Sequence, residues 1–203
     1  MQTFSMSRGK HSRYTLLTCA LALLGFICAV IALPAQEEDQ AGAFQARVPV
    51  AITSCGQSPD TFVVSAAAKQ VGLTHLYDEL VTTQRISGFK TLIIVMGGSS
   101  KGLGEAGLTV SKELARVSAI LDRAKTEGIT IIAVHIGGKA RRGTLSEEFI
   151  DLVVPYADCI IATNEGNKDG KFTKEAQKRG IPLFLLKSSR EINALLKEIF
   201  LQD

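Results

Sequence analysis

Short apolar runs alternate with amphipathic segments from residue 48 onward, and this alternation constrains the fold more than any other feature. The runs predict strands over residues 48–53, 74–77, 91–96, 129–135, 158–163 and 182–187. Several of them, such as "TLIIVM" at 91–96, are apolar at consecutive positions. That pattern is typical of parallel strands covered on both faces, because neither face meets water.

The segments between these runs have helical periodicity. An apolar stripe at helical spacing runs from Val110 to Ala124, and a second one from Ile192 to Ile199. Thr144 and Glu147 have the spacing of a capping box, which predicts a helix that starts after Thr144. Alternating strands and helices specify one doubly wound, mostly parallel α/β sheet of the Rossmann-like or flavodoxin-like class. We expect the strand order 2-1-3-4-5 with a sixth strand added, since the weak run at 74–77 suits an edge.

The N-terminus has the pattern of an export signal. Arg8, Lys10 and Arg13 precede an uncharged apolar run at residues 14–34, and Ala35 would end a cleaved signal peptide. The run is also long enough to span a bilayer, so a signal anchor is the alternative. In both cases the residues after Ala35 cross the membrane, which predicts a periplasmic or extracellular protein. We therefore divide the chain into a signal or anchor (1–35), a polar linker (36–47) and one α/β domain (48–203).

Charge and cysteine content exclude two classes of protein. The three basic residues of the signal account for the formal net charge of +3, so the remaining 168 residues are neutral and we expect no nucleic-acid partner. Cys55 follows the first strand and Cys159 begins the fifth. Opposite ends of a five-residue strand lie roughly 16 Å apart, beyond the reach of a disulfide. We expect two free thiols and no disulfide scaffold.

The stretch "GGSSKGLGEAG" at 97–107 contains G-x-G-x-x-G, the dinucleotide-binding pattern. Five residues separate this pattern from the strand end at Met96, and the following strand ends "AVHIGG" without the acidic residue that binds a ribose. Leu103 stands where a P-loop has lysine. The chain also has no His or Cys pair at metal-ligand spacing. We therefore expect no nucleotide cofactor and no metal.

A ligand site in such a sheet lies outside the carboxyl ends of the strands, where the strand order reverses. The loops at 54–60 and 97–107 flank that point, and the loop at 136–143 adds basic residues. Helix N-termini and cations favour an anionic ligand such as a carboxylate or a phosphate. The expected ligand-binding residues are Gln57, Ser58, Gly97, Gly98, Ser99, Ser100, Lys101, Gly102, Gly104, Arg141 and Arg142. The alternatives are that the glycines serve tight packing and that "KARR" is a solvated loop.

Two further functions stay open. An envelope hydrolase would use His135, at the end of the fourth strand, with a loop serine as candidate nucleophile. That serine would be Ser99 or Ser100, or a serine of the "SCGQS" loop. His135 could instead be a strand-end histidine bonded to neighbouring backbone. A domain that binds a protein partner without a small ligand is the third possibility. Membrane contact is expected only through the N-terminal segment, if it is not cleaved.

Four ordered motifs together resemble a known family. They are "PVAITSCGQSPD", "GGSSKGLGEAGL", "VHIGGKARRGTLSEEFID" and "NEGNKDGKFTKEAQKRGIPLFLL". They are similar to a domain of unknown function found in exported bacterial α/β proteins, and the resemblance covers roughly residues 48–200. It implies a bacterial envelope location and one Rossmann-like domain. It implies no activity, substrate or catalytic residue.

Overall fold

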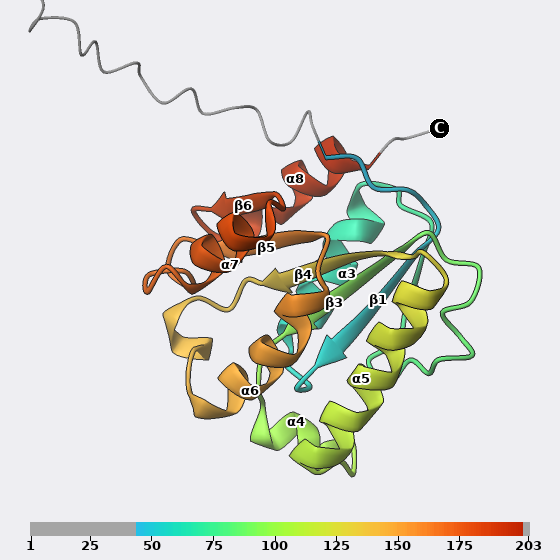
Figure 1. Ribbon diagram of the computed structural model, residues 1–203, viewed down its shortest axis with the longest axis vertical. Coiled ribbons are helices and arrows are strands. Elements are labelled where there is room, and N and C mark those ends of the chain that lie inside the picture. The colour runs from blue at the N-terminus through green and yellow to red at the C-terminus, as the bar shows by residue number, and fades with distance from the viewer. Residues whose placement is uncertain (1–43, 201–203) are drawn as a thin grey trace, which may run out of the picture. The chain divides into compact units, whose positions relative to one another are not determined.

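The computed structural model describes residues 44–200, which form one six-stranded sheet with helices on both faces (Figure 1). The strands are β1 (Val50–Cys55), β2 (His75–Tyr77), β3 (Thr91–Met96), β4 (Thr130–His135), β5 (Cys159–Thr163) and β6 (Leu183–Leu186). The helices are α3 (Asp60–Gln70), α4 (Ser100–Glu105), α5 (Val110–Thr126), α6 (Thr144–Val153), α7 (Lys171–Arg179) and α8 (Ile192–Ile199). Short 3-10 turns are η1 (Lys139–Arg141), η2 (Val154–Tyr156) and η3 (Ser189–Glu191).

The order β2-β1-β3-β4-β5-β6 confirms the predicted topology, and every pair is parallel. The first strand starts at Val50, two residues later than the sequence predicts, because Pro49 has no N–H for the ladder. Cys55 pairs with Met96, and His135 pairs with Ala162. This register aligns the carboxyl ends of the central strands at one edge of the sheet.

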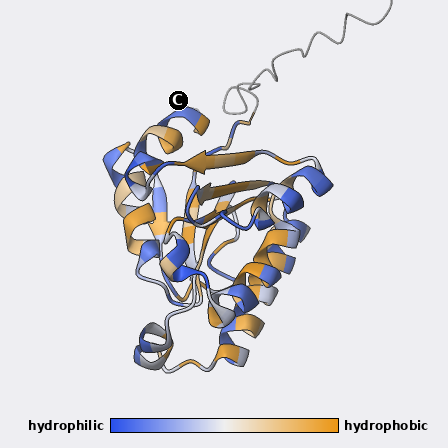
Figure 2. Ribbon diagram, turned by 90° about the vertical axis from the view of Figure 1, so that its left-hand side faces the viewer, coloured by the Kyte–Doolittle hydropathy of each residue, from blue (hydrophilic) through white to orange (hydrophobic). Residues whose placement is uncertain are grey.

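Two apolar cores lie on opposite faces of the sheet. On one face α5, α6 and α7 pack on residues such as Ala51 and Leu92; on the other, α3 and α8 pack on residues such as Val50 and Ile93. Figure 2 shows the strands as hydrophobic, between helices that have both hydrophobic and hydrophilic residues. Cys55 and Cys159 are buried and free, as predicted. The buried sheet therefore explains why the strand runs lack polar alternation.

The predicted N-terminal signal or anchor, residues 1–35, lies outside the described residues. Among residues 44–200, no helix combines the length and the apolar character that crossing a membrane requires.

A buried carboxylate fixes the loop that follows β1. Glu113 of α5 is fully buried, and its carboxylate accepts hydrogen bonds from the Gly56 amide at 3.0 Å and from Gln57 Nε2 at 2.9 Å. Arg116, one turn further along α5, pairs with the same carboxylate at 2.8 Å. The Arg116 guanidinium also donates to the carbonyls of Ser54 and Val81. One buried ion pair thus connects α5, the end of β1 and the loops that follow β1 and β2.

We predict that Glu113→Ala lowers the free energy of unfolding by about 3 kcal/mol, because it leaves the Arg116 charge and the Gly56 amide without their partner. Urea unfolding measures this loss. The matched control is Glu198→Ala, an exposed glutamate of α8 with no ion pair in the described part of the chain, where we expect a change within about 0.5 kcal/mol. A loss at Glu113 no larger than at Glu198 would contradict the structural role of this carboxylate.

Candidate functional site

The loops on either side of the switch point are hydrogen-bonded to each other. Gln57 and Gly98 form an isolated antiparallel bridge. The Gly97 amide donates to the Cys55 carbonyl at 2.9 Å, and the Ser99 amide donates to the Gly56 carbonyl at 2.8 Å. Backbone amides that could have bound an anion at this point are therefore used within the protein.

Two of the glycines in these loops allow close packing. A Cβ on Gly102 would lie 2.2 Å from the Gln57 carbonyl oxygen, and a Cβ on Gly98 would lie 2.5 Å from Leu145 Cγ. By contrast, Gly104 faces open space. Gly98 and Gly102 therefore have the packing role that was the alternative to ligand binding.

Gln57 has a left-handed backbone with φ of 59°, which is uncommon for a residue other than glycine. Its side chain donates to Glu113 and to the Glu79 carbonyl, and these bonds hold the unusual conformation. Gln57, Ser99, Lys101 and Gly102 line a hollow of about 470 Å³, which we call the Gln57 hollow. We expect no strong anion site there, because Glu79 and Glu105 also line it.

The predicted serines have local roles. Ser99 caps α4, because its hydroxyl accepts a hydrogen bond from the Gly102 amide at 3.0 Å. The Ser58 hydroxyl accepts one from the Asp60 amide at the start of α3. Ser100 is exposed, and so is Lys101, whose ammonium lies 3.7 Å from the Glu105 carboxylate.

His135 is completely buried at the end of β4. Its Nδ1 lies 3.0 Å from the Met96 carbonyl oxygen, so this nitrogen donates and carries the proton. Its Nε2 is buried and has no hydrogen bond of normal length to a described residue, although the Gly138 backbone lies nearby. No serine hydroxyl or carboxylate in residues 44–200 is hydrogen-bonded to the ring. This geometry matches the strand-end histidine that the sequence analysis left open.

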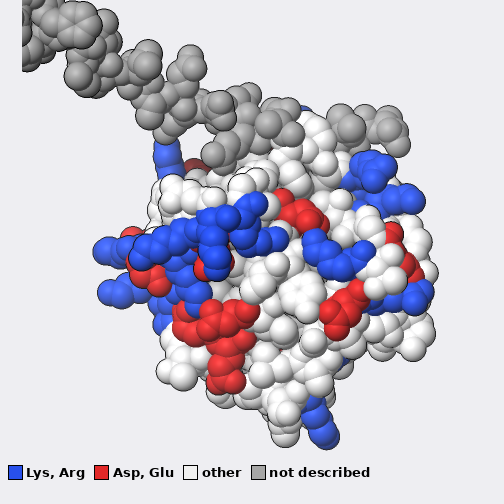
Figure 3. All heavy atoms as spheres, in the orientation of Figure 1, with Lys and Arg blue, Asp and Glu red and all other residues white. Residues whose placement is uncertain are grey.

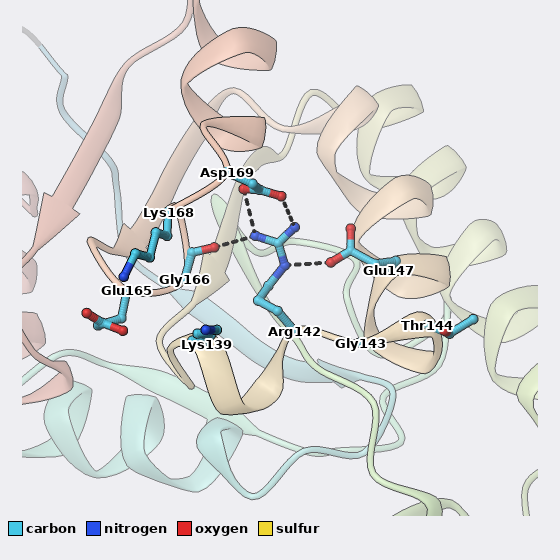
Figure 4. A pocket seen from close by; sticks show the side chains of 9 residues that line it. All are labelled: Lys139, Arg142, Gly143, Thr144, Glu147, Glu165, Gly166, Lys168 and Asp169. Carbon is cyan, nitrogen blue, oxygen red and sulfur yellow. Dashed lines mark hydrogen bonds and ion pairs between the residues drawn. The ribbon is translucent and has the colours of Figure 1, made fainter.

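A larger hollow, of about 660 Å³, lies between the β4–α6 loop and the β5–α7 loop, and we call it the Arg142 hollow. Figure 4 shows the nine residues that line it. Lys139 and Lys168 form no ion pair with any described residue. Thr144, at the first position of α6, lines the same hollow. Two unpaired cations and one helix N-terminus therefore lie around a single cavity.

Arg142 lies in the middle of this hollow and already has protein partners (Figure 4). Its Nε donates to Glu147 at 2.5 Å, its Nη1 donates to the Gly166 carbonyl, and its two Nη atoms form a fork with Asp169 at 3.2 and 2.8 Å. The guanidinium also lies over the Phe172 ring, 5.3 Å from its centroid. The side chain of Arg142 is only 12% exposed.

These ion pairs shift the pKa values of their members. The pKa of Asp169 is lowered, chiefly by its hydrogen bonds with Arg142. Burial works against ionisation of Glu147, but its bonds with Arg142 and Lys171 prevail and lower its pKa. Figure 3 shows the mixed charge of this region, with basic side chains over α7 and acidic ones beside them over α6. Both carboxylates are therefore ionised at neutral pH.

Glu147 also explains why the predicted capping box is wrong. The helix α6 begins at Thr144 with Gly143 as its N-cap, and no side chain caps its first turn. Instead of folding back to the helix start, Glu147 binds Arg142 at 2.5 Å and Lys171 at 2.6 Å. The amides of the first turn of α6 are therefore left without a side-chain acceptor.

Arg141 differs from its neighbour. Its side chain packs on Gly137, where a Cβ would lie 2.2 Å from Arg141 Cγ, and it forms no ion pair with a described residue. Arg141 does not line the Arg142 hollow. Five of the predicted ligand residues line a hollow, with Gln57, Ser99, Lys101 and Gly102 in one and Arg142 in the other. The remaining six line neither of these two hollows: Ser58, Gly97, Gly98, Ser100, Gly104 and Arg141. Binding by either set stays a prediction.

Sequence reasoning grouped Lys139 with Arg142 but missed Lys168 and Asp169 as members of the same cavity. The adjacent fourth and fifth strands did predict that their loops would be neighbours. Sequence reasoning also missed Glu113, although the sequence contains a signal for its role. Glu113 lies on the apolar stripe of its helix between Val110 and Val117, where a carboxylate requires a buried partner.

The fold and the hollows define a single doubly wound α/β domain with open cavities at the carboxyl edge of its sheet. The chain belongs to the family described as a domain of unknown function (DUF6305), whose model matches residues 47–200. No curated protein matches the chain.

Two solved structures show a distant likeness. They are the esterase AlinE4, described as an SGNH-hydrolase family esterase, and a mutant of it. Each is 15% identical to this chain in sequence, with a TM-score of 0.28. Each match covers 78% of this chain and 85% of the esterase chain. At this TM-score the likeness carries no argument about the activity of the chain.

We predict that His135 makes stability depend on pH. Burial lowers the pKa of His135 below its unfolded value near 6.5, and the charge of Arg142 lowers it further. The neutral His135 contributes to the free energy of unfolding above about pH 6.5. This contribution is lost as the pH falls toward the lowered pKa of the folded state, because the unfolded chain binds the proton more readily.

Urea unfolding at pH 7, 6 and 5 measures this effect. Between pH 7 and pH 5 the free energy of unfolding should fall less in His135→Gln than in the wild type. The control is His75→Gln, which removes a half-buried histidine of β2. Equal slopes for the wild type and His135→Gln would contradict the prediction.

Proposed function

We propose that this chain is an exported domain that binds a small anionic ligand in the Arg142 hollow. The proposal rests mainly on one observation: the uncapped first turn of α6 and the unpaired Lys139 and Lys168 border the same cavity. Cavities of several hundred cubic ångströms hold small organic molecules in other proteins. A small molecule is therefore a better match to this site than a macromolecule.

The charges of the hollow favour an anion. Arg142 pairs with two carboxylates, Glu147 and Asp169, and Lys171 supplies a second cation to Glu147, so these four groups together add no net charge. Lys139 and Lys168 outnumber the one remaining acid, Glu165. The N-terminus of α6 contributes about half a positive charge more. These groups suit a carboxylate or a phosphate, which accept hydrogen bonds from ammonium groups and backbone amides.

We also propose that the domain acts in a bacterial envelope. Support comes from the basic N-terminus and apolar run at residues 8–34, and from the resemblance to exported bacterial proteins. A reporter enzyme that is active only outside the cytoplasm, fused behind residue 47, should be active. Deletion of residues 14–34 should abolish that activity, and an inactive fusion with the run intact would contradict export.

We predict that Lys139→Ala combined with Lys168→Ala weakens phosphate binding by roughly tenfold, because each substitution removes one positive charge from the hollow. The test is a nuclear magnetic resonance titration of the purified protein with inorganic phosphate at low ionic strength. Lys197→Ala, an exposed lysine of α8 on another part of the surface, is the matched control and should leave the affinity unchanged.

An unchanged affinity in the double variant would exclude the Arg142 hollow as the site. If weakening followed Lys101→Ala instead, the ligand would occupy the Gln57 hollow.

A further inference from the structure

Arg142 binds a carboxylate of its own protein in the way that arginine binds ligands. Nη1 and Nη2 lie 3.2 and 2.8 Å from the two oxygens of Asp169, which is the bidentate fork by which guanidinium groups bind carboxylates and phosphates. Asp169 lies on the loop between β5 and α7 and lines the Arg142 hollow. The arrangement therefore already holds two acceptor oxygens at the position that a ligand anion would take.

The two carboxylates on Arg142 are not equally easy to replace. The side chain of Asp169 is 55% exposed, so water screens its attraction to Arg142. Glu147 is 30% exposed and is shared with Lys171 at 2.6 Å, which gives it a second cation. A competing anion would therefore displace Asp169 before Glu147.

The guanidinium would keep its orientation after Asp169 left. Glu147 holds Nε, the Gly166 carbonyl holds one proton of Nη1, and the Phe172 ring lies under the plane. One N–H of each Nη atom would then face the hollow. Such a preorganised fork binds an oxyanion with little loss of side-chain entropy.

We propose that Asp169 is an internal competitor for the ligand site. In this proposal, which rests on the proposed function, a ligand with a carboxylate or phosphate group replaces Asp169 on Arg142. Its two oxygens take the two Nη positions, while Lys139 and Lys168 lie around it. The exchange releases the side chain of Asp169 and loosens the loop at 164–170. Ligand binding thus changes the mobility of one surface loop.

The test uses Asp169→Asn. Asparagine keeps the oxygen that accepts the Lys171 amide at 3.2 Å, but it lacks the charge that competes for Arg142. Titration with inorganic phosphate, and separately with acetate, should give about fivefold tighter binding than in the wild type. A gain of this size is expected when the ligand no longer has to break one exposed ion pair. The control is Asp151→Asn, a 65% exposed carboxylate that pairs with Lys171 and not with Arg142. Its affinity should equal that of the wild type.

Hydrogen exchange of the wild-type protein gives a second readout that needs no variant. Saturating phosphate should speed amide exchange at residues 164–170 and leave the strands unchanged. If the wild type binds phosphate and Asp169→Asn binds it no more tightly, or if exchange in the loop slows, the competitor role is wrong while the proposed function stands. If neither protein binds phosphate or acetate, both are wrong.

Discussion

The buried carboxylate of Glu113 fixes the loop that follows β1, and with it the switch point of the sheet. Together with Arg116 it binds the Gly56 amide and the Gln57 side chain, and so holds the loop after β1 against α5. That position brings Gln57 into a backbone bridge with Gly98. At the reversal of strand order, where ligands often bind in such folds, backbone amides of both loops are thereby used in the protein's own hydrogen bonds.

The larger of the two hollows lies further along the sheet, between the loops that follow β4 and β5. Arg142 joins these two loops, since it bonds to Glu147 on α6 and to Gly166 and Asp169 on the other loop. Arg142 therefore has a structural task as well as the recognition task that we propose. Because Glu147 turns toward Arg142 and Lys171, the first turn of α6 stays uncapped, and its amides remain available beside Lys139 and Lys168.

The fold could be predicted from the sequence because a strand that is buried on both faces needs apolar residues at consecutive positions, as in "TLIIVM" and "CIIAT". The free cysteines followed from the same topology. The site could be predicted only as an edge of the sheet. Which side chains share a cavity depends on ion pairs between distant segments, such as Arg142 with Asp169, and neither composition nor spacing encodes these pairs. The predicted capping box is wrong for the same reason. Glu147 binds Arg142 and Lys171 instead of the start of its own helix.

Our central claim is that an anion binds at Arg142 in the hollow between the β4–α6 and β5–α7 loops. The most direct measurement is anomalous diffraction from crystals grown without sulfate or phosphate and soaked in selenate. We predict a selenium peak within hydrogen-bond distance of the Arg142 guanidinium, with Asp169 turned away from it. A peak only in the Gln57 hollow, or a peak at Arg142 with Asp169 still in its fork, would contradict this account.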